Sequence, residues 1–540
     1  MEVELKLQVD AQYSDALLAH PLLAAPNASA PREQKQVDIY YDTPERRLQR
    51  KHIGLRVRRI KNRWVQNIKG NGANGSGDGA RGLGVRSRGE WEWPVAGPAP
   101  ELAHVRQLVD DKQVRRSLGG AGALQKRLVA VFETRVKRTV WDLRLPEGVH
   151  IECALDRGTL ECGEKEMPIS ELELELKAGD ARQLFDLALG LQQDIPLQLG
   201  SRSKAERGYA LLNGGLAQAV KAAPVTLERQ MTVEQAFVVI AANCLVHMQD
   251  NDQRVAREHD VESLHQMRVG MRRLRSALSI FKELLQLPQD LQTELDWLAG
   301  ELGDARDWDV LSGSTLPAVA RKALDGAHIA GVQQAAGDEA HAHHLRTAEA
   351  ISSPRYARLM LQLARWVNTM GWREQVAATT AESVKGRAGV KAAKMAASPA
   401  AAAGAGLQQA VEKFARKVLQ RDQRRLRRRA AKLRGATPEV RHRMRIAAKK
   451  TRYAAEFFAS LFAAKTVRPY VKGLSGLQDE LGLLNDFAVA ERLLTGLSST
   501  HPDIEEGVGF VRGVLAAEVK ADDKKIARLW KNFAPLGLPS

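Results

Sequence analysis

Two stretches that alternate charged and apolar residues decide the fold: Glu2-Val3-Glu4-Leu5-Lys6-Leu7, and Glu171-Leu172-Glu173-Leu174-Glu175-Leu176-Lys177. Successive side chains of a β-strand point to opposite faces of a sheet. The charged residues of each stretch therefore share one face, and the apolar residues share the other. We predict two β-strands that each present carboxylates and an amine on a single face.

Further runs with a period of two predict about eight strands within residues 1–210. These runs span residues 37–41, 55–60, 63–69, 90–95, 135–145 and 150–155. A half-buried sheet with one face in water would account for any single strand. Acids gather on some strands and bases on others, however, which is unusual for a solvated face. If the sheet closes into a barrel, we expect the charged faces to line its interior and outer helices to cover its apolar faces.

An interior that carries both signs of charge needs a ligand that neutralises both. Carboxylates offer the hard oxygen ligands that Mg²⁺ and Mn²⁺ prefer. Arginine and lysine donate charge-assisted hydrogen bonds to phosphate oxygens. A metal-bound oligophosphate satisfies both sets of side chains.

The strands carry motifs that occur in a specific order along the chain. These motifs include Glu2-x-Glu4-x-Lys6, Tyr40-Tyr41-Asp42-Thr43-Pro44, Leu55-Arg56-Val57-Arg58, Arg88-Gly89-Glu90, Glu171-x-Glu173, Ser203-Lys204 and Arg207-Gly208-Tyr209. The set resembles the CYTH domain of the triphosphate tunnel metalloenzymes over residues 1–210. This resemblance implies an eight-stranded antiparallel β tunnel with outer helices, which hydrolyses inorganic triphosphate to pyrophosphate and phosphate.

The resemblance also assigns roles to residues of the tunnel. The implied ligands of Mg²⁺ or Mn²⁺ are Glu2, Glu4, Asp156, Glu171, Glu173 and Glu175. The implied phosphate-binding residues are Lys6, Arg56, Arg58, Lys69, Arg88, Arg138 and Lys204. In the implied mechanism a second metal, held by Glu171 and Glu173, activates the attacking water, and Lys6 and Arg138 also act in catalysis. Adenylate cyclase, thiamine triphosphatase and a binding-only polyphosphate-granule protein remain open alternatives.

Residues 225–540 show apolar residues three and four apart and hardly any strand pattern, which predicts an all-helical region. An offset of 177 residues aligns residues 262–284 with residues 439–461, and Leu302 matches Leu481 at an offset of 179. We therefore predict two related four-helix bundles. The expected boundaries are 211–224 for a linker, about 225–380 for the first repeat, about 385–406 for a low-complexity insert and about 407–535 for the second repeat.

Basic residues form a stripe in each repeat, because steps of three and four residues keep side chains on one helix face. The stripe residues are His265, Arg268, Arg272, Arg273, Arg275, His442, Arg445, Lys449, Lys450 and Arg452. They resemble the CHAD domain, and this resemblance implies a pseudosymmetric pair of four-helix bundles whose shared cleft binds inorganic polyphosphate. A solvated basic face is the alternative, and nucleic acid is a less favoured ligand because the basic run 421–429 lacks interleaved aromatic residues.

Composition places the chain among multidomain globular proteins with a polyanionic partner. It has 540 residues, a formal net charge of +17 and three cysteines. Residues 411–452 alone hold 17 lysines and arginines against Glu412, Asp422 and Glu439. The scarce cysteines favour a reducing compartment, and residues 1–6 lack the basic and apolar regions of a secretion signal. We expect a cytoplasmic protein without a membrane partner, in association with polyphosphate granules.

Overall fold

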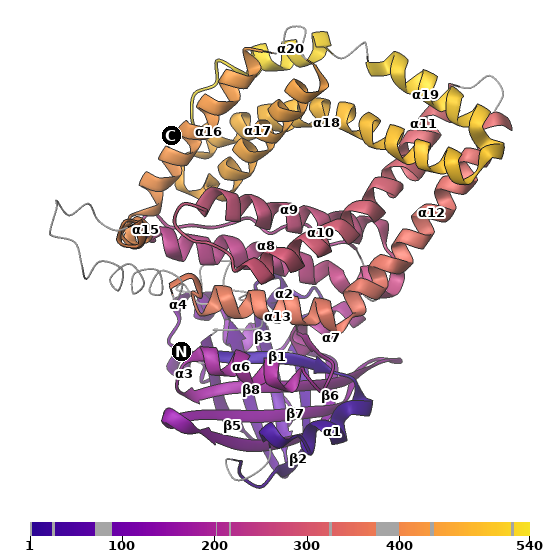
Figure 1. The fold of residues 1–540 in the computed structure, drawn as a ribbon. Coiled ribbons are helices and arrows are strands. Elements are labelled where there is room, and N and C mark those ends of the chain that lie inside the picture. The colour runs from indigo at the N-terminus through magenta and orange to yellow at the C-terminus, as the bar shows by residue number, and fades with distance from the viewer. Residues whose placement is uncertain are drawn as a thin grey trace, which may run out of the picture. The chain divides into compact units, whose positions relative to one another are not determined.

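The computed structural model describes two compact units (Figure 1). The described residues are 3–23, 28–70, 89–200, 202–214, 218–322, 327–373, 399–432, 437–519 and 523–540. Two predicted site residues, Glu2 and Arg88, lie outside these ranges. Unit 1 comprises Met1–Gln218 and Ser353–Gly371, and unit 2 comprises Ala219–Ser352 and Trp372–Ser540.

A single antiparallel sheet forms the centre of unit 1. Its strands are β1 (Val3–Val9), β2 (Arg32–Asp42), β3 (Ile53–Ile60), β4 (Arg63–Gly70), β5 (Gly89–Val95), β6 (Val129–Leu145), β7 (Val149–Cys162), β8 (Lys165–Ala178) and β9 (Leu197–Leu199). Their order in the sheet is β5-β4-β3-β2-β6-β7-β8-β1-β9. The described residues thus form nine strands where the resemblance implied eight. The additional strand, β9, has three residues, too few to show a period in the sequence.

Short helices cover the sheet and its edges. They are α1 (Ser14–Leu18), α2 (Arg47–Arg50), α3 (Val105–Leu108), α4 (Lys112–Leu118), α5 (Ala121–Gln125), α6 (Ala181–Leu191) and α7 (Lys204–Leu212). Leu5 and Leu7 of β1 are fully buried, and so are Leu184 and Phe185 of α6, which contacts β1 and β8. The apolar face of the alternating strands is therefore the outer, helix-covered face, as predicted.

Unit 1 also contains one helix from a distant part of the sequence. Helix α13 (Pro354–Asn368) contacts α6 and β9, and Arg365 Nε lies 2.7 Å from Asp186 Oδ1. The expected first repeat, residues 225–380, included this segment. Its amphipathic pattern predicts a helix correctly, but the apolar face covers the sheet unit.

Unit 2 is all-helical in the residues that the structure describes. Its helices are α8 (Val233–Glu258), α9 (Val261–Phe281), α10 (Gln289–Val310), α11 (Leu316–Ala320), α12 (Ala327–Ser352), α15 (Pro399–Gln408), α16 (Val411–Ala430), α17 (Pro438–Phe457), α18 (Ala464–Thr500), α19 (Glu505–Val519) and α20 (Asp523–Phe533). Helices α8, α9, α10 and α12 pack as one bundle, and α16, α17, α18 and α20 follow as its counterpart. No helix within the described ranges is long and apolar enough to cross a lipid bilayer.

The two repeats share a hydrophobic core. Trp308 of α10, Val332 of α12, Leu494 of α18 and Val511 of α19 belong to one buried cluster. The second half of the long helix α18 thus packs with helices of the first repeat. Because of this shared core, the repeats form one unit.

Candidate functional site

The charged side chains of unit 1 converge on a cavity of about 260 Å³. The predicted site residues that line it are Glu4, Lys6, Arg56, Arg58, Lys69, Arg138, Glu173, Glu175 and Lys204. They come from five strands (β1, β3, β4, β6 and β8) and from α7, and they lie on the face of the sheet opposite the leucines. The interior face predicted from the alternation is therefore confirmed.

Three carboxylates form the acidic centre of this site. One oxygen each of Asp156, Glu171 and Glu173 lies within 4.8 Å of the other two. Strand pairing explains the convergence, because Asp156 of β7 is directly opposite Glu171 of β8, and Glu173 follows on the same face. Asp156 and Glu171 are 0% and 3% exposed. Such an all-oxygen donor set fits Mg²⁺ or Mn²⁺.

Cations hold the three carboxylates in place. Lys204 Nζ lies 2.6 Å from Asp156 Oδ2 and 3.1 Å from Glu173 Oε1, and it also contacts Glu171. Arg138 donates from Nε and Nη2 to the two oxygens of Asp156, both at 2.7 Å. Lys6 contacts Glu173, and its Nζ lies 2.7 Å from Glu4 Oε1. These contacts connect Glu4 with the acidic centre through a shared amine.

The electrostatics keep this cluster ionised. Burial opposes the charged form of Lys204, but Glu171, Glu173 and Asp156 raise its pKa above the usual value. Burial likewise opposes the Glu173 carboxylate, yet Lys204, Lys6 and Arg138 hold its pKa well below the usual value. The Glu173 carboxylate is thus charged at neutral pH.

Helix α7 places a second cation, Arg207, to which the sequence prediction assigned no role. Ser203 caps the helix by accepting a hydrogen bond from Glu206 N, and Arg207, one turn after Lys204, contacts Glu171. A Cβ atom on Gly208 would lie 2.2 Å from the Phe132 ring, so only glycine allows this close approach to β6. The spacing of three residues from Lys204 is a signal that could have identified Arg207.

One buried carboxylate orients two of the predicted phosphate-binding residues. Asp38 of β2, which is 2% exposed, accepts from Arg58 Nε at 2.7 Å and from Arg58 Nη2 at 2.9 Å. It also accepts from Arg56 Nη1 at 3.3 Å. Burial opposes its charge, but the two guanidinium groups lower the pKa of Asp38 strongly. The sequence prediction missed Asp38, although it alternates with Val37 and Ile39 within a predicted strand.

Two predicted residues lie toward the edges of the cavity. Lys69 Nζ lies 2.7 Å from Glu90 Oε2, and burial together with Arg56 lowers the pKa of Lys69. Glu175 pairs with Lys177, with Nζ 2.5 Å from Oε1, and is not one of the three converging carboxylates. Glu175 is therefore a wall residue in this structure, separate from the acidic centre.

In unit 2 the structure brings together four of the predicted stripe residues. Arg268 and Arg272 lie on α9, and Arg445 and Lys449 lie on α17, which contacts α9. Burial and the adjacent Arg272 and Arg445 lower the pKa of Lys449 to about 7. Positive charge is therefore concentrated between the two helices.

Four further stripe residues have other partners. Arg273 is buried over the Phe457 ring, Arg275 pairs with Asp296 at 2.7 Å, Lys450 donates to Ser279 Oγ at 3.0 Å, and Arg452 donates to Gln478 Oε1 at 2.8 Å. His265 is half-buried and His442 is exposed. The sequence prediction did not include Asp307 among the site residues; it lies 3.4 Å from Arg268 and 3.5 Å from Arg492.

Known proteins share both halves of this architecture. The CYTH domain pattern matches residues 1–209, and the CHAD domain pattern matches residues 239–495. An inorganic triphosphatase of Haemophilus influenzae is 34% identical over 175 residues, which are 32% of this chain and 45% of that protein. The chain thus spans less than half the length of that relative.

The helical half resembles a solved structure. A CHAD domain from the plant Ricinus communis is 34% identical and superimposes with a TM-score of 0.50. The alignment covers 60% of this chain and 99% of the plant domain. The chain thus belongs to the proteins in which a CYTH domain, at residues 1–209, precedes a CHAD domain, at residues 239–495.

Proposed function

We propose that the CYTH domain hydrolyses inorganic triphosphate to pyrophosphate and phosphate. The observation that carries this proposal is the buried centre of Asp156, Glu171 and Glu173 within a cavity that arginines and lysines also line. The similarity to an inorganic triphosphatase over 175 residues supports it.

Glu4, Asp156, Glu171 and Glu173 are the described residues that would hold Mg²⁺ or Mn²⁺. A bound divalent ion supplies charge neutralisation at the phosphoryl oxygens and a lower pKa for a coordinated water. The cations around the acidic centre each face a carboxylate. A triphosphate alone would therefore add negative charge to a balanced site, so we expect activity to require a divalent ion.

The basic residues of the cavity bind and orient the substrate in this proposal. Asp38 fixes the Arg58 guanidinium by two hydrogen bonds, so little side-chain entropy is lost when the remaining donors bind phosphate. Lys6 and Arg138 lie beside Glu173 and can stabilise charge that develops on the leaving pyrophosphate.

A substrate panel tests the proposal. Phosphate release by the full chain is measured with tripolyphosphate, ATP, thiamine triphosphate and long-chain polyphosphate, each with Mg²⁺, Mn²⁺ or EDTA. We expect the highest kcat/KM with tripolyphosphate and no hydrolysis in EDTA. Formation of cyclic AMP would favour an adenylate cyclase, a preference for thiamine triphosphate would favour a thiamine triphosphatase, and no hydrolysis of any compound would indicate a binding protein.

We further propose that the CHAD domain binds inorganic polyphosphate between α9 and α17. Arg268, Arg272, Arg445 and Lys449 concentrate charge there, and a polyanion would relieve the repulsion that depresses the pKa of Lys449. Such binding would hold the protein at polyphosphate granules in the cytoplasm.

Matched charge removal tests this second proposal. Alanine at the four stripe positions should abolish polyphosphate binding by the full chain in EDTA. Alanine at four exposed arginines of α16 should have a smaller effect at the same ionic strength; these are Arg424, Arg425, Arg427 and Arg428. An equal loss of polyphosphate binding in both variants would show that the stripe contributes only non-specific electrostatic attraction. Tighter binding of DNA or RNA than of polyphosphate would overturn the ligand assignment.

A further inference from the structure

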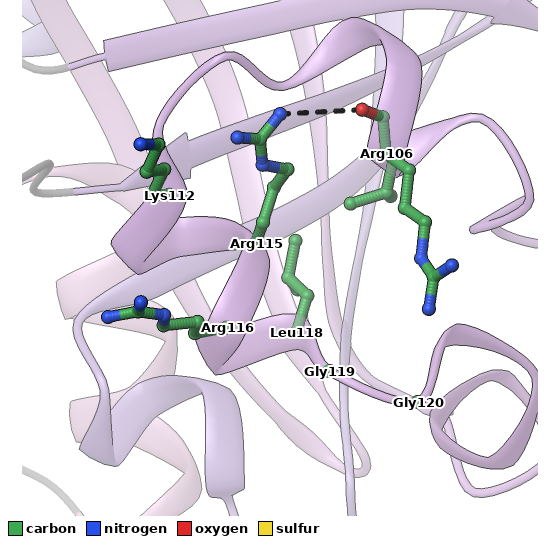
Figure 2. A pocket seen from close by; sticks show the side chains of 8 residues that line it. Arg106, Lys112, Arg115, Arg116, Leu118, Gly119 and Gly120 are labelled. Atoms are coloured by element: carbon green, nitrogen blue, oxygen red, sulfur yellow. Dashed lines mark hydrogen bonds between the residues drawn. The ribbon is translucent and has the colours of Figure 1, made fainter.

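A second basic pocket lies in unit 1, apart from the charged cavity of the sheet (Figure 2). It measures about 450 Å³ and is formed by α3, α4 and the turn that follows α4. Its lining residues are Val105, Arg106, Lys112, Arg115, Arg116, Leu118, Gly119 and Gly120. None of these residues belongs to the predicted triphosphate site.

The fold presents the cations of this pocket to solvent. Asp111 caps α4 by accepting from Gln113 N at 2.7 Å and from Val114 N at 2.8 Å. Val114 and Leu118 then point into the hydrophobic core. Because Lys112, Arg115 and Arg116 are three and four residues apart, they share the outer face of this helix.

Arg115 connects the two helices of the pocket. Its Nη1 lies 3.5 Å from the carbonyl oxygen of Arg106, and Figure 2 shows Leu118 between these two arginines. Gly120 has a φ of +66°, a conformation that lets the chain turn sharply at the rim. A hydrogen bond between the two helices and the turn at Gly120 therefore define the shape of the pocket.

The cations of this pocket form no ion pair with the described carboxylates. Across the described ranges, no carboxylate oxygen lies within 4.0 Å of a charged nitrogen of Arg106, Lys112, Arg115 or Arg116. The neighbouring acids have other roles, because Asp110 accepts from Trp91 Nε1 at 2.8 Å and Asp111 caps α4. Elsewhere on the same unit, surface cations such as Arg32 and Lys137 pair with carboxylates.

Helix α2 extends the basic surface. Arg47 Nη2 and Lys51 Nζ both donate to the carbonyl oxygen of Ser117, at 3.3 and 3.4 Å. Two more cations therefore lie at the C-terminal end of α4. The positive charges of these residues repel one another, and an anion with several charges would relieve this repulsion.

We propose that this pocket binds a chain of phosphates as a second site, distinct from the hydrolytic cavity. The guanidinium forks of Arg106, Arg115 and Arg116 match phosphate oxygens. Among the residues that the structure describes, no aromatic side chain lines the pocket, so these residues offer no platform for stacking bases. This favours a phosphate chain over a nucleic acid. Free oligophosphate and the end of a long polymer share this chemistry.

Arginine footprinting of the full chain tests the site residue by residue. Modification by phenylglyoxal is followed by mass spectrometry in EDTA, at fixed ionic strength, with tripolyphosphate, long-chain polyphosphate, single-stranded DNA or sulfate. We expect a phosphate chain to slow modification of Arg106, Arg115 and Arg116 several-fold and to leave the exposed Arg63 and Arg144 unchanged. Protection by tripolyphosphate identifies free oligophosphate as sufficient, whereas protection by the polymer alone identifies the long chain.

Paired variants exclude general electrostatics. Arg106→Ala with Arg116→Ala should abolish the protection of Arg115, whereas Arg63→Ala with Arg144→Ala removes the same charge and should preserve it. The proposal is overturned if neither phosphate chain protects the pocket, if DNA protects it better, or if both variants lose protection equally. Tripolyphosphate hydrolysis should remain unchanged in both variants, so failure of this site is distinguishable from failure of the hydrolytic site.

Discussion

Glu173→Gln is the substitution with the clearest expected consequence, because Glu173 contacts Lys6, Lys204 and Arg138. Glutamine keeps the shape of the side chain and removes its charge. Each of the three cations keeps another carboxylate: Lys6 keeps Glu4 at 2.7 Å, Lys204 keeps Asp156 at 2.6 Å, and Arg138 keeps Asp156 at 2.7 Å. The loss of folding free energy should therefore be about 1.5–3 kcal/mol, the contribution of a hydrogen bond to a charged group. This loss of folding free energy should stay below the roughly 3–5 kcal/mol lost when one partner of a buried ion pair is removed and the other charge stays uncompensated.

The effect on activity should be larger than the effect on folding. Glu173 is one of three converging carboxylates. In the proposed site they would hold a metal ion, which would stabilise the charge that develops in the transition state by several kcal/mol. We expect kcat/KM for tripolyphosphate to fall at least about 100-fold, or about 2.7 kcal/mol. Phosphate release at saturating Mn²⁺ measures this change, and a urea titration confirms that the variant is folded.

Glu175→Gln is the matched control for this experiment. Glu175 lies two residues further on the same face of β8 and pairs with Lys177, outside the acidic centre. We expect it to lower kcat/KM less than about tenfold, since it loses one partly exposed ion pair. Near wild-type turnover by Glu173→Gln, or equal losses in both variants, would refute the assignment of the acidic centre.

Further predictions address the phosphate donors, the polyphosphate stripe and the metal. Arg58→Ala should remove about 1.5–3 kcal/mol of transition-state stabilisation and lower kcat/KM accordingly. Alanine at the exposed neighbour Arg59 should have little effect. An unchanged kcat/KM for Arg58→Ala would place this residue outside the substrate site. Because the pKa of Lys449 is lowered to about 7, its charge is lost as the pH rises above 7, and polyphosphate binding should weaken between pH 6.5 and 8.5. Lys449→Arg should flatten this dependence in a binding titration, and an unchanged slope would contradict the role of Lys449. EDTA should abolish hydrolysis but not polyphosphate binding, and a parallel loss of both would show that one metal site serves both functions.

The alternation of charged and apolar residues was sufficient to predict eight strands and the face that lines the cavity. It could not predict β9, because three residues do not establish a period. It also could not predict the partner of α13, since an amphipathic helix reveals that one face is buried but not which core it covers.

The sequence could predict those site residues that are charged and alternate with apolar residues along a strand. Asp38 and Arg207 were missed because their main contacts are with other protein charges, and these contacts depend on strand register and helix placement. In the stripe, helical spacing grouped Arg275 with Arg268, but the exposed Arg275 pairs with Asp296. Periodicity predicts which residues share a face of a helix. Which of these residues a ligand can contact depends on how the helix packs against its neighbours.

The most direct test of the hydrolytic site is the position of its metal. Crystals of the full chain, grown with Mn²⁺ and a non-hydrolysable tripolyphosphate analogue, allow an anomalous difference map at the manganese edge. We predict a peak coordinated by Asp156, Glu171 and Glu173, with the analogue in contact with Arg56 and Arg58. A peak at another site, or an analogue bound only outside the cavity, would contradict the proposed triphosphatase site.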